Sequence, residues 1–556
     1  MSRTICLMMA LRRRGATVLR HGVRQMLVAL LLFAPTLCSK AMEWRGLMID
    51  VSRHYMPIDF LEREIDAMHR YGLNTLHLHL TDAAGWRMEI RKYPRLTEIG
   101  AWRTAWEWKT WWNDGHRAYA DSSAYGGYYT QEELRSLVDY AAKRGVTIVP
   151  EIEFPAHSEE VIAAYPHLGY NKAELDMASD DVFRFMDDVL TEVAAVFPSP
   201  YLHVGGDEAG TQHARQPDAM RRINAIVRRL GRRLIVWDEA LTDDPADSTM
   251  AIMVWRNTDT AIRAMRLGHQ VVMSPGAFCY LDKYQDAPAT QPEAMGGYLP
   301  LKDMYQSLMA SSEALRDEPK LLGYQANLWT EYIPTAAHAE YMAWPRALCI
   351  AALPGGCLCS ADEGPTDASY LAFRRRAIEA TRYLRDTLHI NTFPLDKEVG
   401  QRPEYDQPTK SLSTGRGVTY LSRYYDGYAA GGCQALTDGL RGGWSNTDGR
   451  WQGFIGRGRM DVVIDLQKVR RIRSVRSSFM QNTGPEIYLP ARIIISSSRD
   501  GRHYTTLSDT TYVETQAPVD FVTRGWTGRG RARYIRFQAL NGSRGGWVFA
   551  DEVEVY

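Results

Sequence analysis

The sequence predicts an α/β protein: a (β/α)8 TIM barrel followed by a small all-β sandwich domain. Eight short β-rich runs alternate with helical patterns over about 300 residues, which is the pattern of such a barrel. Beyond Pro394 the composition becomes polar and proline-containing. From Val418 onward, short alternating runs are separated by glycine-rich turns, which indicates a sandwich.

Each predicted barrel strand is a short run rich in β-branched and other apolar residues. The intervening segment Thr130–Arg144 opens with Thr, carries acidic residues in its first turn and closes on Gly145, as a helix does. We therefore expect the barrel to span residues 42–393. Its eight strands are predicted at Leu47–Val51, Thr75–Leu80, Thr147–Ile152, Tyr201–Val204, Leu234–Trp237, Ile252–Trp255, Val271–Ser274 and Gly323–Leu328.

The remainder of the chain divides into a linker, residues 394–416, and a sandwich domain, residues 417–556. No convincing amphipathic helix appears in this second domain. Its predicted strands include Asp461–Leu466, Ile472–Ser477, Arg492–Ser497, Tyr534–Gln538 and Val553–Tyr556.

Residues 1–41 have the pattern of an export signal, with a basic stretch at Arg12–Arg14, an apolar run at Met26–Leu37 and small residues before the expected cleavage after Ala41. The apolar run is shorter than the roughly 20 residues that a membrane-spanning helix needs. We expect an exported protein in the periplasm, at the cell surface or in the medium. A start at Met26 and a lipid anchor stay open as alternatives.

The amino-acid composition limits the kinds of partner that the chain is expected to bind. Lys plus Arg equals Asp plus Glu, 66 each, so the chain as a whole has no field that favours nucleic acid. The five cysteines after the signal form no disulfide framework. Cys357 and Cys359 lack further ligands nearby in sequence, and we expect buried thiols there rather than a metal site.

Functional groups of a barrel project from the carboxyl ends of its strands. Those ends are crowded here with acids, bases and aromatic residues, and burying so many charges in one place favours a site over a core. The residues concerned are Asp50, Arg53, His77, His79, Asp82, Glu151, Glu153, His157, Asp207, Glu208, Trp237, Asp238, Glu239, Trp255, Trp329 and Glu331.

Three of these strand ends carry a tryptophan: Trp237, Trp255 and Trp329. An indole face stacks well on the apolar face of a pyranose ring. For any single tryptophan, plain core packing is an equal alternative. Three at strand ends together favour a sugar pocket.

The adjacent pair Asp207 and Glu208 follows Gly205 and Gly206. Neighbours in an extended chain point to opposite sides, so both carboxylates reach one pocket only if the backbone turns, which the glycines permit. Paired carboxylates suit glycoside hydrolysis, in which one protonates the leaving oxygen. A capped strand end is the structural alternative for this pair taken alone.

The run HVGGDE, His203–Glu208, resembles the signature of glycoside hydrolase family 20, the β-N-acetylhexosaminidases. Five further motifs resemble the family in order along the barrel, so the resemblance covers the whole of it. They are GLMIDVSRH at Gly46–His54, HLHLTDAAGWRMEIRKYPRLTEIGAWR at His77–Arg103, PEIEFPAHS at Pro150–Ser158, YLD at Tyr280–Asp282 and LWTE at Leu328–Glu331.

The resemblance implies substrate-assisted catalysis with retention, in which the sugar's 2-acetamido oxygen is the nucleophile. Asp207 would orient the acetamide, and Glu208 would act as acid and then base. Tyr280 would hold the acetamido oxygen. The resemblance also implies a wall of indoles around the methyl group, formed by Trp237, Trp255 and Trp329.

The resemblance to the family also implies that Arg53 and Glu331 bind the ring hydroxyls of the terminal sugar. Asp282 would lie near the acetamide or the 6-hydroxyl. Together they would close the far end of the pocket and make the action exo. Asp82 and His157 resemble the family's supporting dyad, which tunes the acid's pKa.

Two features complicate this interpretation. His77 and His79 allow a metal site, but we predict no catalytic metal and no cofactor, because the further ligands of metal-dependent barrel hydrolases are missing. The third-strand motif has Glu153, Phe154 and Ala156 where the family pattern leads us to expect Asp, Met and Gly.

The sandwich resembles discoidin-like carbohydrate-binding modules through Ala435–Gly439, Val463–Leu466 and Asp551–Val553. Such folds hold structural calcium near loops like those of Asp438 and Glu552, and a packing role is as compatible with the sequence as sugar binding.

For the whole chain, the sequence also allows a disaccharide-releasing or sulfated-sugar-specific relative and a catalytically silent glycan-binding barrel. The intact residues Arg53, Asp207, Glu208 and Tyr280 argue against the silent barrel. GlcNAc against GalNAc preference, the natural glycan and the oligomeric state stay open.

Overall fold

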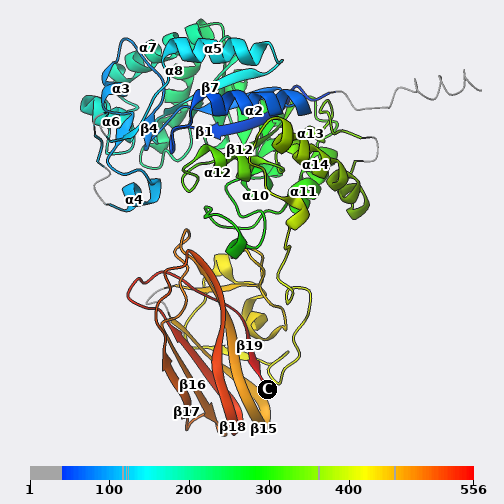
Figure 1. The fold of residues 1–556 in the computed structure, drawn as a ribbon. Helices are drawn as coiled ribbons and strands as arrows, with labels where there is room; N and C mark the ends of the chain where they lie inside the picture. Colours follow the sequence, from blue (N-terminus) through cyan, green and yellow to red (C-terminus); the bar gives the residue numbers. More distant parts are fainter. Residues whose placement is uncertain (1–40, 115–117, 121, 123, 361–362, 456–458) are drawn as a thin grey trace, which may run out of the picture.

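A computed structural model describes residues 41–114, 118–120, 122, 124–360, 363–455 and 459–556. The predicted export signal, except its last residue, lies outside this range. Figure 1 shows two bodies, an α/β barrel and an all-β domain, joined end to end. None of the helices in the described ranges combines the length and apolar character of a bilayer-crossing segment.

The barrel is a closed sheet of eight parallel strands in the order β1–β12–β11–β10–β9–β8–β7–β2. All eight strands lie where the sequence predicts them, so the predicted fold class is confirmed. Their bounds are β1 Trp44–Asp50, β2 Thr75–His79, β7 Thr147–Phe154, β8 Tyr201–Gly205, β9 Arg233–Trp237, β10 Ala251–Val254, β11 Gln270–Met273 and β12 Leu321–Leu328.

Helices cover the outside of the barrel (Figure 1). The predicted helix after Thr130 is α5, Gln131–Ala142, and Thr130 and Glu133 form a reciprocal capping box at its start. The other long helices are α2 Ile58–Tyr71, α7 Asp180–Val196, α8 Gln216–Arg229, α9 Thr258–Arg266, α11 Leu301–Ala314, α12 Ala336–Ala343 and α14 Asp367–Thr387.

Short elements build the loops at the carboxyl end of the sheet. The most important for the site are β3 Thr81–Asp82 and β4 Gly85–Trp86, which pair directly after β2. The remaining short strands and α-helices of the barrel are α3 Arg95–Glu98, β5 Trp102–Arg103, α4 Trp108–Asn113, β6 Tyr125–Gly126, α6 Glu159–Ala164, α10 Gly276–Cys279 and α13 Leu348–Ala351.

The inside of the barrel changes character along its axis. A buried apolar cluster that includes Val149, Ile235, Met253 and Val272 fills part of it. Next to this cluster the interior side chains are polar, as Gln325 and several charged residues described below are fully buried. Polar groups are buried only where partners satisfy them, so this inner layer prepares a site.

The second domain is one antiparallel sheet system in the order β14–β19–β15–β18–β16–β17, with β13 paired to β15. Two of the strands predicted separately, at 461–466 and 472–477, are joined in the single strand β15, which bends where its register shifts between Asp465 and Arg470. Bounds are β13 Val418–Tyr420, β14 Gln452–Phe454, β15 Arg459–Asn482, β16 Arg492–Ser498, β17 Thr505–Thr511, β18 Val519–Leu540 and β19 Val548–Val555.

The two bodies are in contact through the segment that follows β11. The Asp286 carboxylate accepts hydrogen bonds from the backbone N–H groups of the linker residues Val399 and Gly400, both at 2.7 Å, and Trp444 Nε1 of the sandwich donates to the Gly400 oxygen at 2.9 Å. Val519, at the start of β18, packs against the barrel core. The sandwich is therefore anchored to the loop that also carries the predicted site residue Asp282.

Closure of the barrel between β1 and β12 depends on Gly323. A Cβ there would lie 1.8 Å from the backbone oxygen of Trp44, and the φ of +151° also favours glycine. We expect Gly323→Ala to destabilise the protein by about 3 kcal/mol or more, measured as a lower urea midpoint. Gly417→Ala is the control because a Cβ there meets nothing within 4 Å. Equal midpoints for the two variants would contradict this account of closure.

Candidate active site

The backbone turns sharply where β8 ends. Gly205 and Gly206 have φ of +63° and +90°, and Glu208 has φ of +50°, a conformation that is uncommon outside glycine. A Cβ on Gly205 would lie 1.9 Å from Glu153 Oε2. The turn brings Asp207 and Glu208 to the same side, where His157 Nε2 lies 3.8 Å from Asp207 Oδ2 and 3.3 Å from Glu208 Oε2.

The two adjacent carboxylates lie in different environments. The Asp207 side chain is 18% exposed, and burial raises its pKa to about 6. The Glu208 side chain is 66% exposed, and its hydrogen bond with His157 lowers its pKa. The pair is therefore suited to two separate tasks rather than one shared proton.

His157 connects Glu208 to the buried Asp82. Its Nδ1 lies 3.4 Å from Asp82 Oδ2, opposite the nitrogen that faces Glu208. Burial alone would lower the pKa of His157, but the Asp82 carboxylate outweighs this and raises that pKa well above its usual range. The imidazole is therefore held as a cation between two carboxylates.

Arg53 lies on the other side of Asp82. Its NH2 group is 2.7 Å from Asp82 Oδ2 and 3.8 Å from Glu331 Oε1, and its NH1 group is 3.4 Å from Asp50 Oδ2. The guanidinium also lies 5.1 Å from the ring centre of Trp329. Arg53 is thus fixed at the pocket floor by three carboxylates and an indole.

An aromatic wall stands beside these charges. The rings of Trp237 and Trp329 are 6.0 Å apart, and Tyr280 meets Trp329 edge-on at 5.9 Å. Trp255 and Trp329 are partly buried and pack against the cluster that contains Trp237. All predicted aromatic site residues therefore belong to one surface.

The carboxylate oxygens Asp207 Oδ1, Asp282 Oδ1 and Glu331 Oε2 are buried and have no hydrogen-bond partner from another residue in the described part of the chain. Burial raises the pKa of Asp282 to about 6 and that of Glu331 to about 7. Buried polar atoms are normally paired, so these atoms are available to hydroxyl and amide groups of a ligand.

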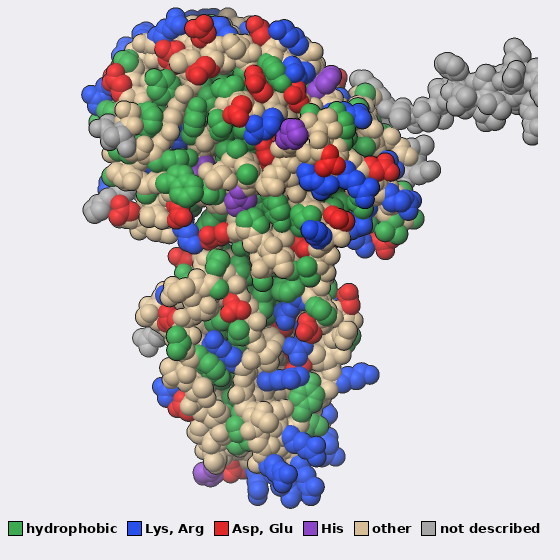
Figure 2. All heavy atoms as spheres, viewed as in Figure 1, with side chains coloured by type: hydrophobic (Ala, Val, Ile, Leu, Met, Phe, Trp, Pro, Cys, Tyr) green, Lys and Arg blue, Asp and Glu red, His purple; other side chains and the backbone are tan. Residues whose placement is uncertain are grey.

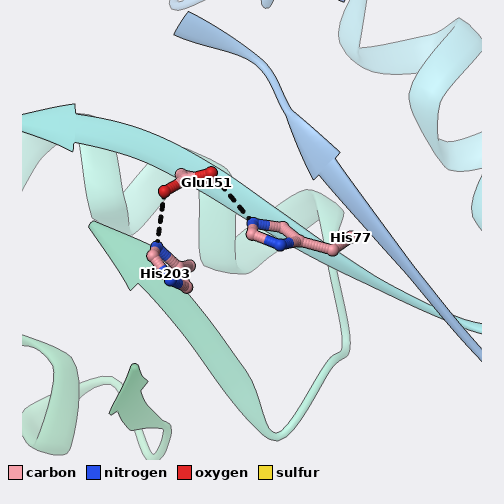
Figure 3. Close-up of side chains that lie close together, drawn as sticks. All are labelled: His77, Glu151 and His203. Atoms are coloured by element: carbon pink, nitrogen blue, oxygen red, sulfur yellow. Dashed lines mark ion pairs between the residues drawn. The ribbon is translucent and has the colours of Figure 1, made fainter. Parts of the chain in front are cut away.

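Beneath the pocket lies the fully buried carboxylate of Glu151, on β7. Trp237 Nε1 donates to it at 2.8 Å, and it is approached by His79 Nδ1 at 2.6 Å, His203 Nδ1 at 2.7 Å and His77 Nε2 at 3.0 Å. Figure 3 shows two of these rings, His77 and His203, pointing at the two oxygens of the carboxylate. Burial would raise the pKa of Glu151, but the histidines hold it well below its usual range.

The same groups bear on the possibility of a metal site. His77, Glu151 and His203 converge closely enough to be considered as ligands, as do His79, Glu151 and Glu153. However, the Glu151 oxygens lie at hydrogen-bond distance from ring nitrogens, which leaves little room for an ion between them. The absence of a catalytic metal stays a prediction.

Sequence patterns alone give no individual role to Glu151, His79 or Glu239. Glu239 Oε2 accepts the backbone N–H of Glu208 at 2.7 Å and so fixes the turn. The available signal is the alternation of charged residues along strands that are otherwise apolar. Such alternation marks side chains that point into the barrel, but it does not say which of them are neighbours.

An eight-stranded barrel whose rim joins an acid pair, a buried arginine and an indole wall is arranged as the barrel glycoside hydrolases are. Residues 42–353 match the family model "Glycosyl hydrolase family 20, catalytic domain", and the chain belongs to this family. Residues 418–553 match the "F5/8 type C domain".

Similar proteins are named β-hexosaminidases. That of Porphyromonas gingivalis is 37% identical over 348 residues, covering 56% of this chain and 43% of the relative. That of Vibrio furnissii is 34% identical over 346 residues, covering 56% of each chain. The chain thus spans about half the length of these curated relatives.

Solved structures agree with the fold. The family 20 exo-β-N-acetylglucosaminidase of Vibrio harveyi, in complex with N-acetylglucosamine, is 30% identical with a TM-score of 0.54, covering 64% of this chain and 60% of that one. The β-N-acetylhexosaminidase of Streptomyces coelicolor is 26% identical with a TM-score of 0.53, covering 65% of this chain and 72% of that one.

Glu151 and Glu153 provide a matched pair for testing the buried network. Glu151 is an anion among ring nitrogens, whereas burial, with the charges of Asp207 and Glu151, raises the pKa of Glu153 well above its usual range and keeps it neutral. We expect Glu151→Gln to lower the unfolding free energy at pH 7 by about 3 kcal/mol or more, because it removes the nearer of the two carboxylates, Glu151 and Asp82, that face the buried His79 cation. Glu153→Gln replaces a neutral acid and should cost under about 1 kcal/mol. Urea titration checks both, and a Glu153 variant as unstable as the Glu151 variant would contradict the assignment.

Proposed function

We propose that this protein is an exo-acting, retaining β-N-acetylhexosaminidase that removes terminal, non-reducing, β-linked GlcNAc or GalNAc from glycans. The observation that carries the proposal is the unequal pair of Asp207 and Glu208, one buried with an unpartnered oxygen and the other exposed and bonded to His157. Membership of family 20 and the names of the relatives support the same activity.

In this proposal the enzyme contributes no nucleophile. The oxygen of the substrate's 2-acetamido group attacks the anomeric carbon while the bond to the leaving oxygen breaks, which forms an oxazolinium ion. Asp207 Oδ1, buried and unpartnered, accepts the acetamide N–H and stabilises the positive charge. The Tyr280 hydroxyl holds the acetamido oxygen, and the wall of Trp237, Trp255 and Trp329 encloses the methyl group.

Glu208 moves the protons. A bound sugar covers its carboxyl group, and the loss of water raises its pKa so that it carries the proton that the leaving oxygen takes. Glu208 then removes a proton from the water that opens the oxazolinium ring. Two inversions at the anomeric carbon give overall retention. His157, held as a cation by Asp82, steadies the ionised form between the two steps.

Exo action follows from the closed side of the pocket. Arg53 and Glu331 present a guanidinium and a carboxylate to the ring hydroxyls of the terminal sugar, and Asp282 adds an unpartnered oxygen. Arg53 is buried and paired with Asp82 at 2.7 Å, which holds it in this position. A sugar bound there has no space for a further residue on its non-reducing side.

Assays on chromogenic β-N-acetylglucosaminide and β-N-acetylgalactosaminide test the proposal. We expect release that Glu208→Gln and Asp207→Asn each reduce about 100-fold or more, because each removes a group that acts in the transition state. A thiazoline that mimics the oxazolinium ion should inhibit, and a β-glucoside lacking the acetamide should react poorly.

Glu132→Gln is the matched control for these variants, since Glu132 is exposed in the first turn of α5, and its activity should equal that of the wild type. Equal rates of hydrolysis of the β-glucoside and of the β-N-acetylglucosaminide would contradict substrate-assisted catalysis. Sugar binding without release would favour a silent lectin, and release of disaccharides alone would favour a disaccharide-specific relative.

We also propose structural calcium in the sandwich domain, near Asp438 and Glu552. Glu552 Oε2 accepts the N–H of Gly439 at 3.0 Å, while its buried Oε1 has no partner in the described part of the chain. Burial, then the neighbouring Asp438 and Asp551 carboxylates, raise the pKa of Glu552 to about 9. A hard cation with oxygen ligands would relieve this repulsion and fits the donor set.

Thermal unfolding of the full chain in excess calcium and in chelator tests the calcium site. We expect a higher transition temperature in calcium, because an ion that binds only the folded state stabilises it. Glu552→Gln should abolish the difference, whereas Glu486→Gln, at an exposed position, should keep it. Identical transitions of the wild type in calcium and chelator would contradict the site.

Export is a third proposal. It rests on the basic, apolar and small-residue pattern of residues 1–41, which is typical of a cleaved signal. A glycan-trimming enzyme with an attached F5/8 type C domain suits a location in the periplasm, at the cell surface or in the medium.

A further inference from the structure

Four arginines form a cluster where the long strands β15 and β18 bend. Arg471 and Arg531 are direct cross-strand partners, and Arg473 and Arg529 follow two residues away from them on the same two strands. Ile472, between Arg471 and Arg473, and Ala532, next to Arg531, are buried, so the alternation of a strand points the arginines outward. We call Arg471, Arg473, Arg529 and Arg531 the arginine cluster.

All four side chains of the arginine cluster are exposed. Within the described residues none of them forms an ion pair, although neighbouring arginines do. Arg476 pairs with Glu554 and Arg533 pairs with Asp465. Like charges directly opposite one another weaken a sheet, so the Arg471–Arg531 pair carries a cost that packing does not explain.

The arginine cluster lies at the far end of the molecule. The other end of the β15–β18 ribbon, at Asn482 and Val519, meets the barrel through Gly296 and the barrel core. Figure 2 shows Lys and Arg side chains gathered at the end of the sandwich away from the barrel, where the labels of β15 and β18 stand in Figure 1. A ligand bound there leaves the active site open.

The sandwich domain carries a positive charge that the zero net charge of the whole chain does not reveal. Lys plus Arg equals Asp plus Glu over all 556 residues, but basic residues outnumber acidic ones within 417–556. Residues 466–476 and 524–536, the two segments that pair at the bend, contain no Asp or Glu at all. The neighbouring carboxylates of Asp465 and Glu554 are paired with Arg533 and Arg476, so the field at the arginine cluster is local and positive.

We propose that the arginine cluster binds a sulfated polysaccharide and tethers the enzyme to it. Guanidinium groups bind planar or tetrahedral oxyanions in bidentate fashion, and four of them at strand spacing, about 7 Å along each strand, suit a chain with repeated sulfates. The choice of a glycan over other polyanions rests on the proposed glycosidase function. If the active site cleaves glycans, a second site on the same chain that binds a glycan would hold the enzyme close to its substrates.

Titration of the full-length protein with heparin at two salt concentrations tests the proposal. We expect the quadruple variant in which the cluster arginines become Gln to bind about tenfold or more weakly, and the affinity of the wild type to fall as salt rises. The corresponding quadruple Lys variant keeps the charge but loses the bidentate contacts, so its affinity should lie between the two. All four sites are exposed, and the thermal transition of each variant reports whether it folds.

A matched control removes four exposed arginines from the barrel, none of which has an ion pair among the described residues, and should bind heparin like the wild type. Its substitutions are R91Q, R228Q, R375Q and R382Q. Equal weakening of the control and cluster variants would overturn the proposal, as would tighter binding of duplex DNA or anionic lipid vesicles than of heparin. Hydrolysis of the small chromogenic substrate is measured in parallel, so that failure of the tether and failure of the proposed glycosidase function can be told apart. Activity without heparin binding would reject the tether and leave the glycosidase function standing.

Discussion

The carboxylate of Glu151 organises the catalytic end of the barrel. It is fully buried, and ring nitrogens from β2, β8 and β9 surround it at 2.6–3.0 Å. An isolated charge in this position would be very costly, so the four rings must take these positions for the barrel to close around it. Because one of the rings is Trp237, the same contact that satisfies the anion also sets the position of the pocket wall.

From this anion a chain of alternating acids and bases runs to the solvent. His79 lies 2.6 Å from Glu151 and 3.3 Å from Asp82, which lies 3.4 Å from His157, which lies 3.3 Å from Glu208. Each charge faces an opposite one, and burial strengthens every contact except the last. Only Glu208, at the end of the chain, is exposed enough to exchange its proton with a ligand or water.

The second domain is coupled to this arrangement through one loop. Asp286 fixes the backbone of Val399 and Gly400, and Met295 N–H donates to the backbone oxygen of Asp282 at 3.0 Å. The loop that carries Tyr280 and Asp282 is thus held at both the barrel and the sandwich. The sandwich supports the pocket at one end and presents the arginine cluster at the other.

The sequence alone determined the eight strands, the order of the barrel and the residues at the strand ends, because strand periodicity and ordered motifs are local properties of the chain. It also predicted the turn after Gly205. Only the tertiary structure decided that β15 is continuous, since a bend at Asp465–Arg470 resembles a strand break in the sequence. It also decided the role of Glu151. The closure of the barrel determines which buried charges on the four strands become neighbours, and their spacing in the sequence does not.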